Sequence, residues 1–257
     1  ALRAHWRTRP RRPFVCLIHG DEREEHGWFL DRLRRHSLPA VLKLDARPSI
    51  VSELPWSPSR SAANSEQFLQ DLGYALLETT AASAKEVLDA LSKYEEPLML
   101  RSELLASEVE HGGEKFLDAF LKFCDDGPDL PLGRILIHCV CLKYSRPMGT
   151  DGFLRQWRMR QRNADWRTVV TTKIDFTKYA NLSGVVLPEL RGIPRTDVIE
   201  WSRLDLVRRQ RRIEESEIRE VYEDLKQHCD KDGHLPMDSD RKSTRLNSRS
   251  PCNLVCR

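Results

Sequence analysis

Short, nearly continuous runs of apolar residues recur along the chain and predict β-strands. Five such runs lie at residues 14–18, 40–44, 98–100, 135–142 and 184–187. Apolar and polar residues do not alternate within them, which is typical of strands buried on both faces of a parallel sheet. The second run follows Pro39 and ends before Pro48. Residues 14–44 are therefore expected to form one β-α-β unit with a right-handed crossover.

The segments between these runs carry apolar residues at the three- and four-residue spacing of amphipathic helices. Predicted helices cover residues 65–79, 84–93, 114–124, 153–166 and 208–228, and a further helix begins near Thr196. A loop rich in proline and serine is expected at residues 54–60. Strands separated by helices predict an α/β fold, a three-layer sandwich around a mostly parallel five-stranded sheet. The expected arrangement resembles that of P-loop NTPases, with an added C-terminal helix.

The composition is that of a globular chain. Hydrophobic residues make up 40% and charged residues 32%, so the 257 residues can bury a core. No apolar run approaches the roughly 18–20 residues of a membrane span, and the N-terminus has no signal segment, so we expect a cytoplasmic protein. The seven cysteines lack the paired CxxC spacing of a zinc site or a disulfide framework. Cys139 and Cys141 are expected to be buried core residues.

Both ends of the chain differ in composition from its body. Residues 1–12 hold five arginines and no acid, and we interpret them as a basic linker from an upstream region. Residues 240–248 resemble the translation of a sequencing adapter, so we interpret residues 240–257 as a disordered artefact and the chain as a fragment. Between the ends we expect the α/β domain at residues 13–206 and an amphipathic helix with a short end segment at residues 207–239.

The ends also explain the positive net charge of +3. Residues 240–257 contain five basic residues and one acid, so the charge of the rest is −1, and without residues 1–12 it is −6. The basic excess therefore does not mark the body of the chain as a nucleic-acid or membrane binder.

Residues 14–33 form the strand, turn and helix where a nucleotide hydrolase keeps its phosphate-binding loop, GxxxxGK[ST]. In that loop, backbone N–H groups cradle the phosphates, the lysine reaches the β- and γ-phosphates, and the hydroxyl holds Mg²⁺. Here Trp28 and Phe29 stand where the lysine and the hydroxyl are needed, and the turn is acidic, which repels phosphate. The helix dipole, worth about 0.3–1 kcal/mol, does not compensate. We predict that this degenerate phosphate-loop position binds no nucleotide; it comprises Gly20, Asp21, Gly27 and Trp28.

A nucleotide hydrolase also needs an acid at the end of another buried strand to hold Mg²⁺. The run at residues 98–100 is instead followed by a cation, and this degenerate position comprises Arg101, Ser102 and Glu103. A hydrolase of the GxSxG type is not supported either, because the nearest match has Ala75 in place of the serine. We therefore expect no enzyme activity, no catalytic residue, no metal and no cofactor.

Residues 155–167 combine arginines with tryptophans, and two interpretations stay open. Trp157, Arg158, Arg160 and Arg162 are candidates for nucleic-acid contacts by charge and stacking. The alternative is a solvated helix whose tryptophans pack on the sheet. A further alternative for the domain is nucleotide binding without hydrolysis through the turn at Gly20.

Several segments together resemble a known family, the inactive STAND (iSTAND) domain. They lie at residues 13–22, 29–33, 54–56 and 184–190, with Trp201 and residues 234–238 beyond. STAND proteins are signal-transducing P-loop ATPases, and the inactive branch keeps the fold without the nucleotide motifs. The resemblance covers roughly residues 13–238. It implies a non-catalytic regulatory or sensor module of a bacterial multidomain conflict or defence protein, whose partners are a fused effector domain and other proteins.

Overall fold

A computed structural model describes residues 2–8, 11–24, 26–42, 51–56, 58, 64–79, 83–94, 96–109, 113–127, 129–131, 134–146, 152–191, 216, 219–220 and 223. The chain divides into two compact units, and each is described by itself. The first unit, residues 1–22 and 28–189, contains the sheet. The second comprises residues 23–27 and 190–257, where Ser216, Arg219, Glu220 and Glu223 are helical and exposed. The rest of the predicted helix at 208–228, the helix near Thr196, Trp201 and residues 234–257 lie outside the described residues.

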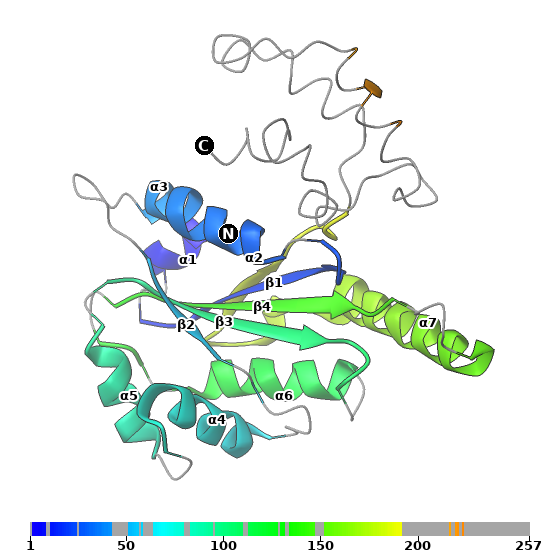
Figure 1. Ribbon diagram of the computed structural model, residues 1–257. Helices are drawn as coiled ribbons and strands as arrows, with labels where there is room; N and C mark the ends of the chain where they lie inside the picture. The colour runs from blue at the N-terminus through cyan, green and yellow to red at the C-terminus, as the bar shows by residue number, and fades with distance from the viewer. Residues whose placement is uncertain are drawn as a thin grey trace. The chain divides into compact units, whose positions relative to one another are not determined.

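The sheet has five strands, all parallel, in the order β2-β3-β4-β1-β5 (Figure 1). The strands are β1 (Phe14–Asp21), β2 (Ser52–Pro55), β3 (Leu98–Leu105), β4 (Leu136–Tyr144) and β5 (Ser183–Val186). β1 and β4 lie at the centre and are almost entirely buried. The predicted α/β fold with a parallel five-stranded sheet is confirmed.

Helices cover both faces of the sheet (Figure 1). One face carries α1 (Leu2–Thr8), α2 (His26–Arg32), the π-helix η1 (Leu33–Ser37) and α3 (Leu38–Leu42). The other carries α4 (Ser65–Leu77), α5 (Ala84–Ser92) and α6 (Gly113–Asp126), with α7 (Phe153–Thr168), η2 (Val169–Lys173) and the short η3 (Phe176–Lys178) beside them. α1 forms within the segment interpreted as a linker, and after it Arg12 pairs with Asp129 at 2.8 Å.

The larger hydrophobic core lies between the sheet and the second group of helices. α6 supplies buried side chains at helical spacing, including Phe116 and Phe120, while Val15 and Leu17 enter from β1. Trp56 lies at the centre, with its ring centroid 5.8 Å from Phe120. Cys139 and Cys141 are fully buried in β4, as the sequence predicted.

The prediction of the second strand was wrong. Residues 40–44 were expected to form it, but Leu38–Leu42 are α3, and the strand is Ser52–Pro55, which overlaps the predicted loop at 54–60. β2 is an edge strand, which tolerates Pro55. Its Glu53 forms ion pairs and its Leu54 packs on the core, so it lacks an apolar run that would reveal it.

Candidate functional site

The carboxyl ends of the parallel strands form the edge where ligands bind in α/β sheets. The chain leaves β1 for β2 at one side of the sheet, and it leaves β4 for β5 at the other. The strand order therefore reverses between β1 and β4. At this point Gly20 is level with Lys143 and Asp21 with Tyr144. In a nucleotide hydrolase, the phosphate loop and the acid that holds Mg²⁺ would both lie at this edge.

The structure corrects the placement of the phosphate-loop position. Gly20 and Asp21 were expected in the turn, but both belong to β1 and pair with β4. Gly27 and Trp28 lie in the first turn of α2. The sheet unit includes Gly20, Asp21 and Trp28, whereas the second unit includes Gly27. The strand continues because its backbone is paired with β4 through Tyr144, whatever the turn preference of glycine.

Arg146 donates hydrogen bonds to both acidic residues at the end of β1. Its guanidinium Nε donates to Asp21 Oδ2 at 2.6 Å, and the backbone N–H of Arg146 donates to Glu22 Oε1 at 3.0 Å. The Glu22 N–H in turn donates to the Tyr144 carbonyl at 3.0 Å. Asp21 is thus paired with the Arg146 guanidinium, whereas Glu22 is held by a neutral backbone N–H.

A histidine–tyrosine contact lies on the face of the larger core, two residues before Asp21 in β1. His19 Nδ1 is 2.8 Å from the Tyr144 hydroxyl, and the Arg167 guanidinium stacks 4.2 Å from the centre of the Tyr144 ring. Arg167 also donates to Glu189 at 2.9 Å. Burial raises the pKa of Tyr144, the Glu189 carboxylate raises it further, and Arg167 opposes both. The phenol is therefore protonated at neutral pH and acts as a hydrogen-bonding group, not as a base.

The second candidate position lies inside β3. The strand was expected to end at residue 100, but it continues to Leu105, so Arg101, Ser102 and Glu103 are strand residues. Arg101 and Glu103 point to the face of α2, while Ser102 is buried on the other face, and no described group bonds its hydroxyl. Pairing with β4 carries the strand through its charged residues, because their backbones bond as well as those of apolar residues.

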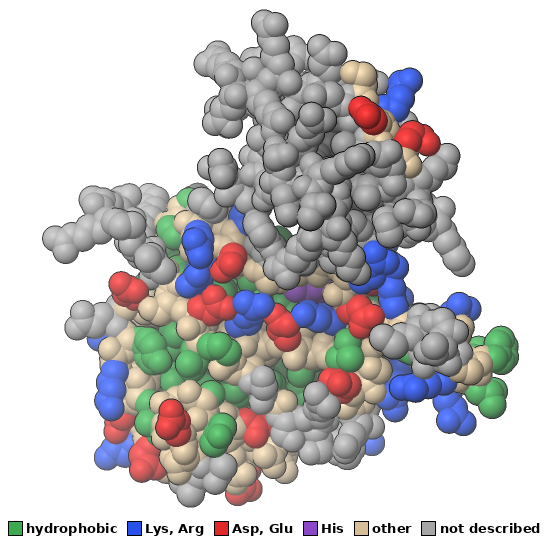
Figure 2. Space-filling model, in the orientation of Figure 1, with side chains coloured by type: hydrophobic (Ala, Val, Ile, Leu, Met, Phe, Trp, Pro, Cys, Tyr) green, Lys and Arg blue, Asp and Glu red, His purple; other side chains and the backbone are tan. Residues whose placement is uncertain are grey.

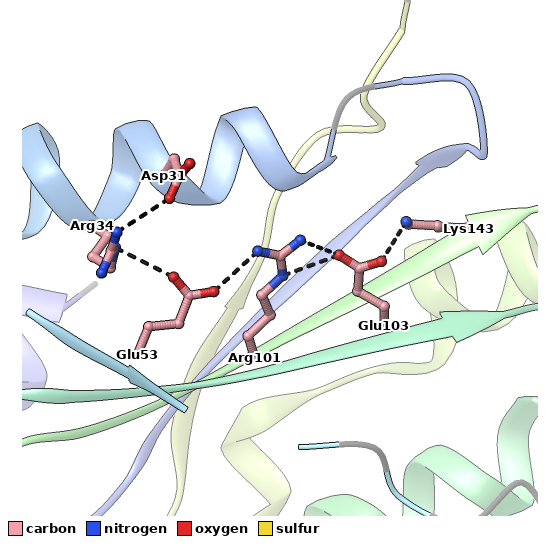
Figure 3. Close-up of polar contacts among 6 residues, drawn as sticks. All are labelled: Asp31, Arg34, Glu53, Arg101, Glu103 and Lys143. Atoms are coloured by element: carbon pink, nitrogen blue, oxygen red, sulfur yellow. Dashed lines mark hydrogen bonds and ion pairs between the residues drawn. The ribbon is translucent and has the colours of Figure 1, made fainter. Parts of the chain in front are cut away.

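Arg101 and Glu103 are the centre of a row of alternating charges that we call the charge ladder (Figures 2 and 3). Its members are Asp31, Arg34, Glu53, Arg101, Glu103 and Lys143. Arg101 donates to Glu53 at 3.0 Å and through Nε to Glu103 at 3.0 Å, and Lys143 donates to the other oxygen of Glu103. Arg34 pairs with Glu53 at 3.3 Å and with Asp31 at 3.4 Å. Three carboxylates and three cations make the ladder neutral.

Contacts within the ladder hold Glu103 and Arg101 in their charged forms. Burial raises the pKa of Glu103, but hydrogen bonds from Lys143 and Arg101 outweigh it and lower the pKa below its usual range. Burial lowers the pKa of Arg101, and the hydrogen bonds to Glu103 and Glu53 raise it above its ordinary value. Each cation that faces α2 from β3 or β4 therefore already has a carboxylate partner. The ladder offers phosphate no spare positive charge.

β3 ends at Leu105, and the two residues that follow it are not acidic; Glu108 is the first acid beyond them. Leu105 is level with Lys143 of β4, and Ala106 and Ser107 follow. Their carbonyls accept hydrogen bonds from α7: Trp166 Nε1 donates to Ala106 at 3.1 Å, and Arg162 donates to Ser107 at 2.5 Å. Among the described residues there is also no group of three His, Cys, Asp or Glu side chains that could hold a metal ion.

Arg162, Asn163 and Trp166 contact the segments that follow β3 and β4, and we call these three residues the base of α7. The sequence analysis did not identify this part of the edge. Asn163 is buried and donates to the Ser145 carbonyl at 2.7 Å, next to the Trp166 and Arg162 contacts. Together these three side chains hold the segments that follow β3 and β4. The sequence signal was Asn163 three positions before Trp166, a spacing that places both side chains on one face of a helix.

The remaining candidates of α7 separate into two groups. Trp166 is 2% exposed, as the packing interpretation predicted, while Trp157 is 56% exposed and does not pack on the sheet. Arg158 and Arg160 are exposed, whereas Arg162 bonds the chain itself. The four candidate nucleic-acid contacts are therefore not equivalent.

Buried thiols and the buried His138 do not supply catalytic groups either. Burial raises the pKa values of Cys124 and Cys141, so both thiols stay protonated at neutral pH. Burial lowers the pKa of His138 to about 3, which keeps its imidazole neutral. His138 Nδ1 has no hydrogen-bond partner among the described residues.

The geometry agrees with the comparisons to known proteins. A family model described as inactive STAND matches residues 1–142, more than half of the chain. The match runs from α1 into β4 and includes both degenerate positions, and it starts earlier and ends earlier than the resemblance seen in the sequence. No curated protein matches the chain. In the part of the chain that the structure describes, no helix is long and apolar enough to cross a membrane. The chain belongs to the inactive STAND family.

Proposed function

We propose that this domain is a non-catalytic regulatory, sensor or scaffold module of a bacterial multidomain signalling or defence protein. In this role it binds a fused effector domain or another protein in the cytoplasm and hydrolyses no nucleotide. The observation that carries the proposal is the pairing of charges on the α2 face of the sheet and at the end of β1. The ladder is neutral, and the Arg146 guanidinium is paired with Asp21.

The electrostatics of this edge oppose a nucleotide. A phosphate oxygen about 4 Å from one carboxylate is repelled by about 4 kcal/mol at an effective dielectric constant of 20. A helix N-terminus returns only about 0.3–1 kcal/mol at an exposed position. Only Asp21 is paired with the Arg146 guanidinium, so the Glu22 carboxylate keeps a charge that repels a phosphate beside the end of β1. Residues 21–27 contain four acids and one cation, Arg23, and no lysine, so the turn is acidic overall.

The same contacts support a role that depends on a stable folded surface and not on a bound ligand. The ladder joins η1, β2, β3 and β4, and the base of α7 joins the segments after β3 and β4. A sheet edge held by its own side chains needs no ligand for its order. Such an edge is suited to a domain that presents surfaces to protein partners.

The test is phosphate release from ATP and GTP with Mg²⁺ by the full chain, beside the Asp21→Asn variant. We expect the same background rate for both proteins, because any residual activity then comes from a contaminant. Hydrolysis above that background that changes with Asp21→Asn would overturn the proposal.

A nucleic-acid-binding role is the second candidate, and the exposure of Trp157, Arg158 and Arg160 is the observation that favours it. The engagement of Arg162 by Ser107 and the burial of Trp166 weaken it, since affinity for phosphates grows with the number of free cations. Binding of a labelled single strand at low salt that falls steeply with added salt, and is lost in Arg158→Ala with Arg160→Ala, would support this role.

A further inference from the structure

The N-terminal end of α7 exposes three large apolar side chains together. Phe153 is 80% exposed, Leu154 67% and Trp157 56%. At about 100° per residue along a helix, the three lie within an arc of roughly 100°. Asn163 and Trp166, which are buried, lie on roughly the opposite side. We call the three residues the apolar tip; it faces away from the sheet.

The apolar tip stands clear of the sheet. α7 runs outward past the carboxyl ends of the strands (Figure 1), and hydrophobic side chains gather at its far end with Lys and Arg side chains beside them (Figure 2). Contact between water and adjacent phenylalanine, leucine and tryptophan side chains is unfavourable, and such exposed apolar patches mark interaction sites. Trp and Arg are also the residues most enriched among energetically dominant interface contacts.

Arginines border the apolar tip on both sides. On the helical projection Arg160 lies next to Phe153, and Arg158 lies next to Leu154. Residues 153–164 contain four arginines and no acid, and Asp165 is the first acidic residue of α7. Asp165 accepts a hydrogen bond from Gln161 at 3.0 Å. The surface that complements this tip is therefore apolar at its centre and acidic at its rim.

A membrane fits this surface less well than a protein does. A helix that lies in a membrane interface needs an apolar stripe along its length. On α7 the side of the apolar tip continues with Gln161, Ala164 and Thr168, which are exposed and polar or small. The apolar contact is thus limited to the first turns, which matches a compact pocket in a protein.

We propose that the apolar tip docks into an acidic, apolar groove or helix of a partner protein, where Phe153, Leu154 and Trp157 are buried and Arg158 and Arg160 pair with carboxylates. This inference rests on the proposed function, and it names the surface and the chemistry through which the module binds its partner.

The test measures binding of the full chain to a pair of fluorescein-labelled amphipathic peptides by anisotropy. Both peptides carry Leu and Phe on one helical face; one has Glu on the other face and its match has Lys. We expect the acidic peptide to bind at least tenfold more tightly than the basic one. Trp157→Ala and Phe153→Ala should each weaken it at least about tenfold. Tyr74→Ala is the matched control, because Tyr74 is 60% exposed on α4, and it should change nothing.

Charge reversal distinguishes this docking from nonspecific hydrophobic binding. Arg158→Glu combined with Arg160→Glu should reverse the preference, so that the basic peptide binds more tightly. Equal binding of both peptides, insensitivity to Trp157→Ala, or tighter binding of an oligonucleotide or of phosphatidylserine vesicles would overturn the inference. Loss of the inference in this way leaves the proposed function intact, because nucleotide hydrolysis is measured independently.

Discussion

The buried His138 makes the stability of the domain depend on pH. Its ring lies 5.5 Å from Trp56 and 5.9 Å from Phe120, and no described group bonds Nδ1. Burial lowers its pKa from 6.5 to about 3. In the unfolded chain His138 gains a proton as the pH falls below 6.5, whereas in the folded chain it does so only near pH 3. Acid therefore favours the unfolded state, and stability is lost as the pH falls from 6.5 towards 3.

The size of this effect follows from the shift. A pH of 5 lies about 1.5 pH units below the pKa of His138 in the unfolded chain. Protonation of the unfolded state therefore lowers the free energy of unfolding by about 2 kcal/mol relative to pH 7.5. We would measure the free energy of unfolding in urea at both pH values for the wild type and for His138→Phe. The wild type should lose about 2 kcal/mol more than the variant between the two values.

The comparison removes contributions from the other histidines, because they titrate in both proteins. A general loss of stability in the variant does not affect the result, since only the change with pH is compared. His138→Leu, a second variant without a titrating side chain, should match the Phe variant. Equal pH dependence in all three proteins would refute the reasoning and would mean that His138 is charged or hydrated in the folded state.

Three further predictions test the polar contacts and the packing of the sheet and of α7. Glu103→Gln should lower the free energy of unfolding by about 1–2 kcal/mol in urea titrations at neutral pH, since two cations lose their shared carboxylate, and high salt should reduce the loss. Gly184→Val should cost about 1–3 kcal/mol by calorimetry, because a Cβ there lies 2.3 Å from the Phe176 ring, and Phe176→Ala should recover part of it. Trp166→Phe should cost about 1 kcal/mol or more in urea, while Trp157→Phe should stay within about 0.5 kcal/mol; equal losses would contradict the packing of α7.

The central strands were predictable because burial on both faces leaves an unbroken apolar run. β1 and β4 show this, and their residues face helices on both sides. β2 was not predictable, because its stability comes from pairing with β3 and from the ion pair of Glu53 with Arg101. Both are contacts with residues more than 40 positions away in the chain. Local propensity carries no record of such contacts.

The candidate site was predictable in chemistry but less so in position. The absence of a lysine and a hydroxyl after Gly20 is visible in the sequence alone. The pairing of Arg101 with Glu103 is also local, since alternate residues of a strand share a face. The partners Arg146 and Lys143 lie far along the chain, and only the register of β4 brings them to Asp21 and Glu103. The exposure of Trp157 beside the burial of Trp166 likewise depends on where the sheet ends beneath α7.

The most direct test of the account is calorimetric titration of the full chain with ATP and Mg²⁺ at millimolar nucleotide. The account predicts no saturable heat, because the cations of the sheet edge are paired with the chain's own carboxylates and Asp21 and Glu22 repel phosphate. Saturable binding that weakens in an Arg146→Ala variant and keeps its affinity in a Trp157→Ala variant would contradict it.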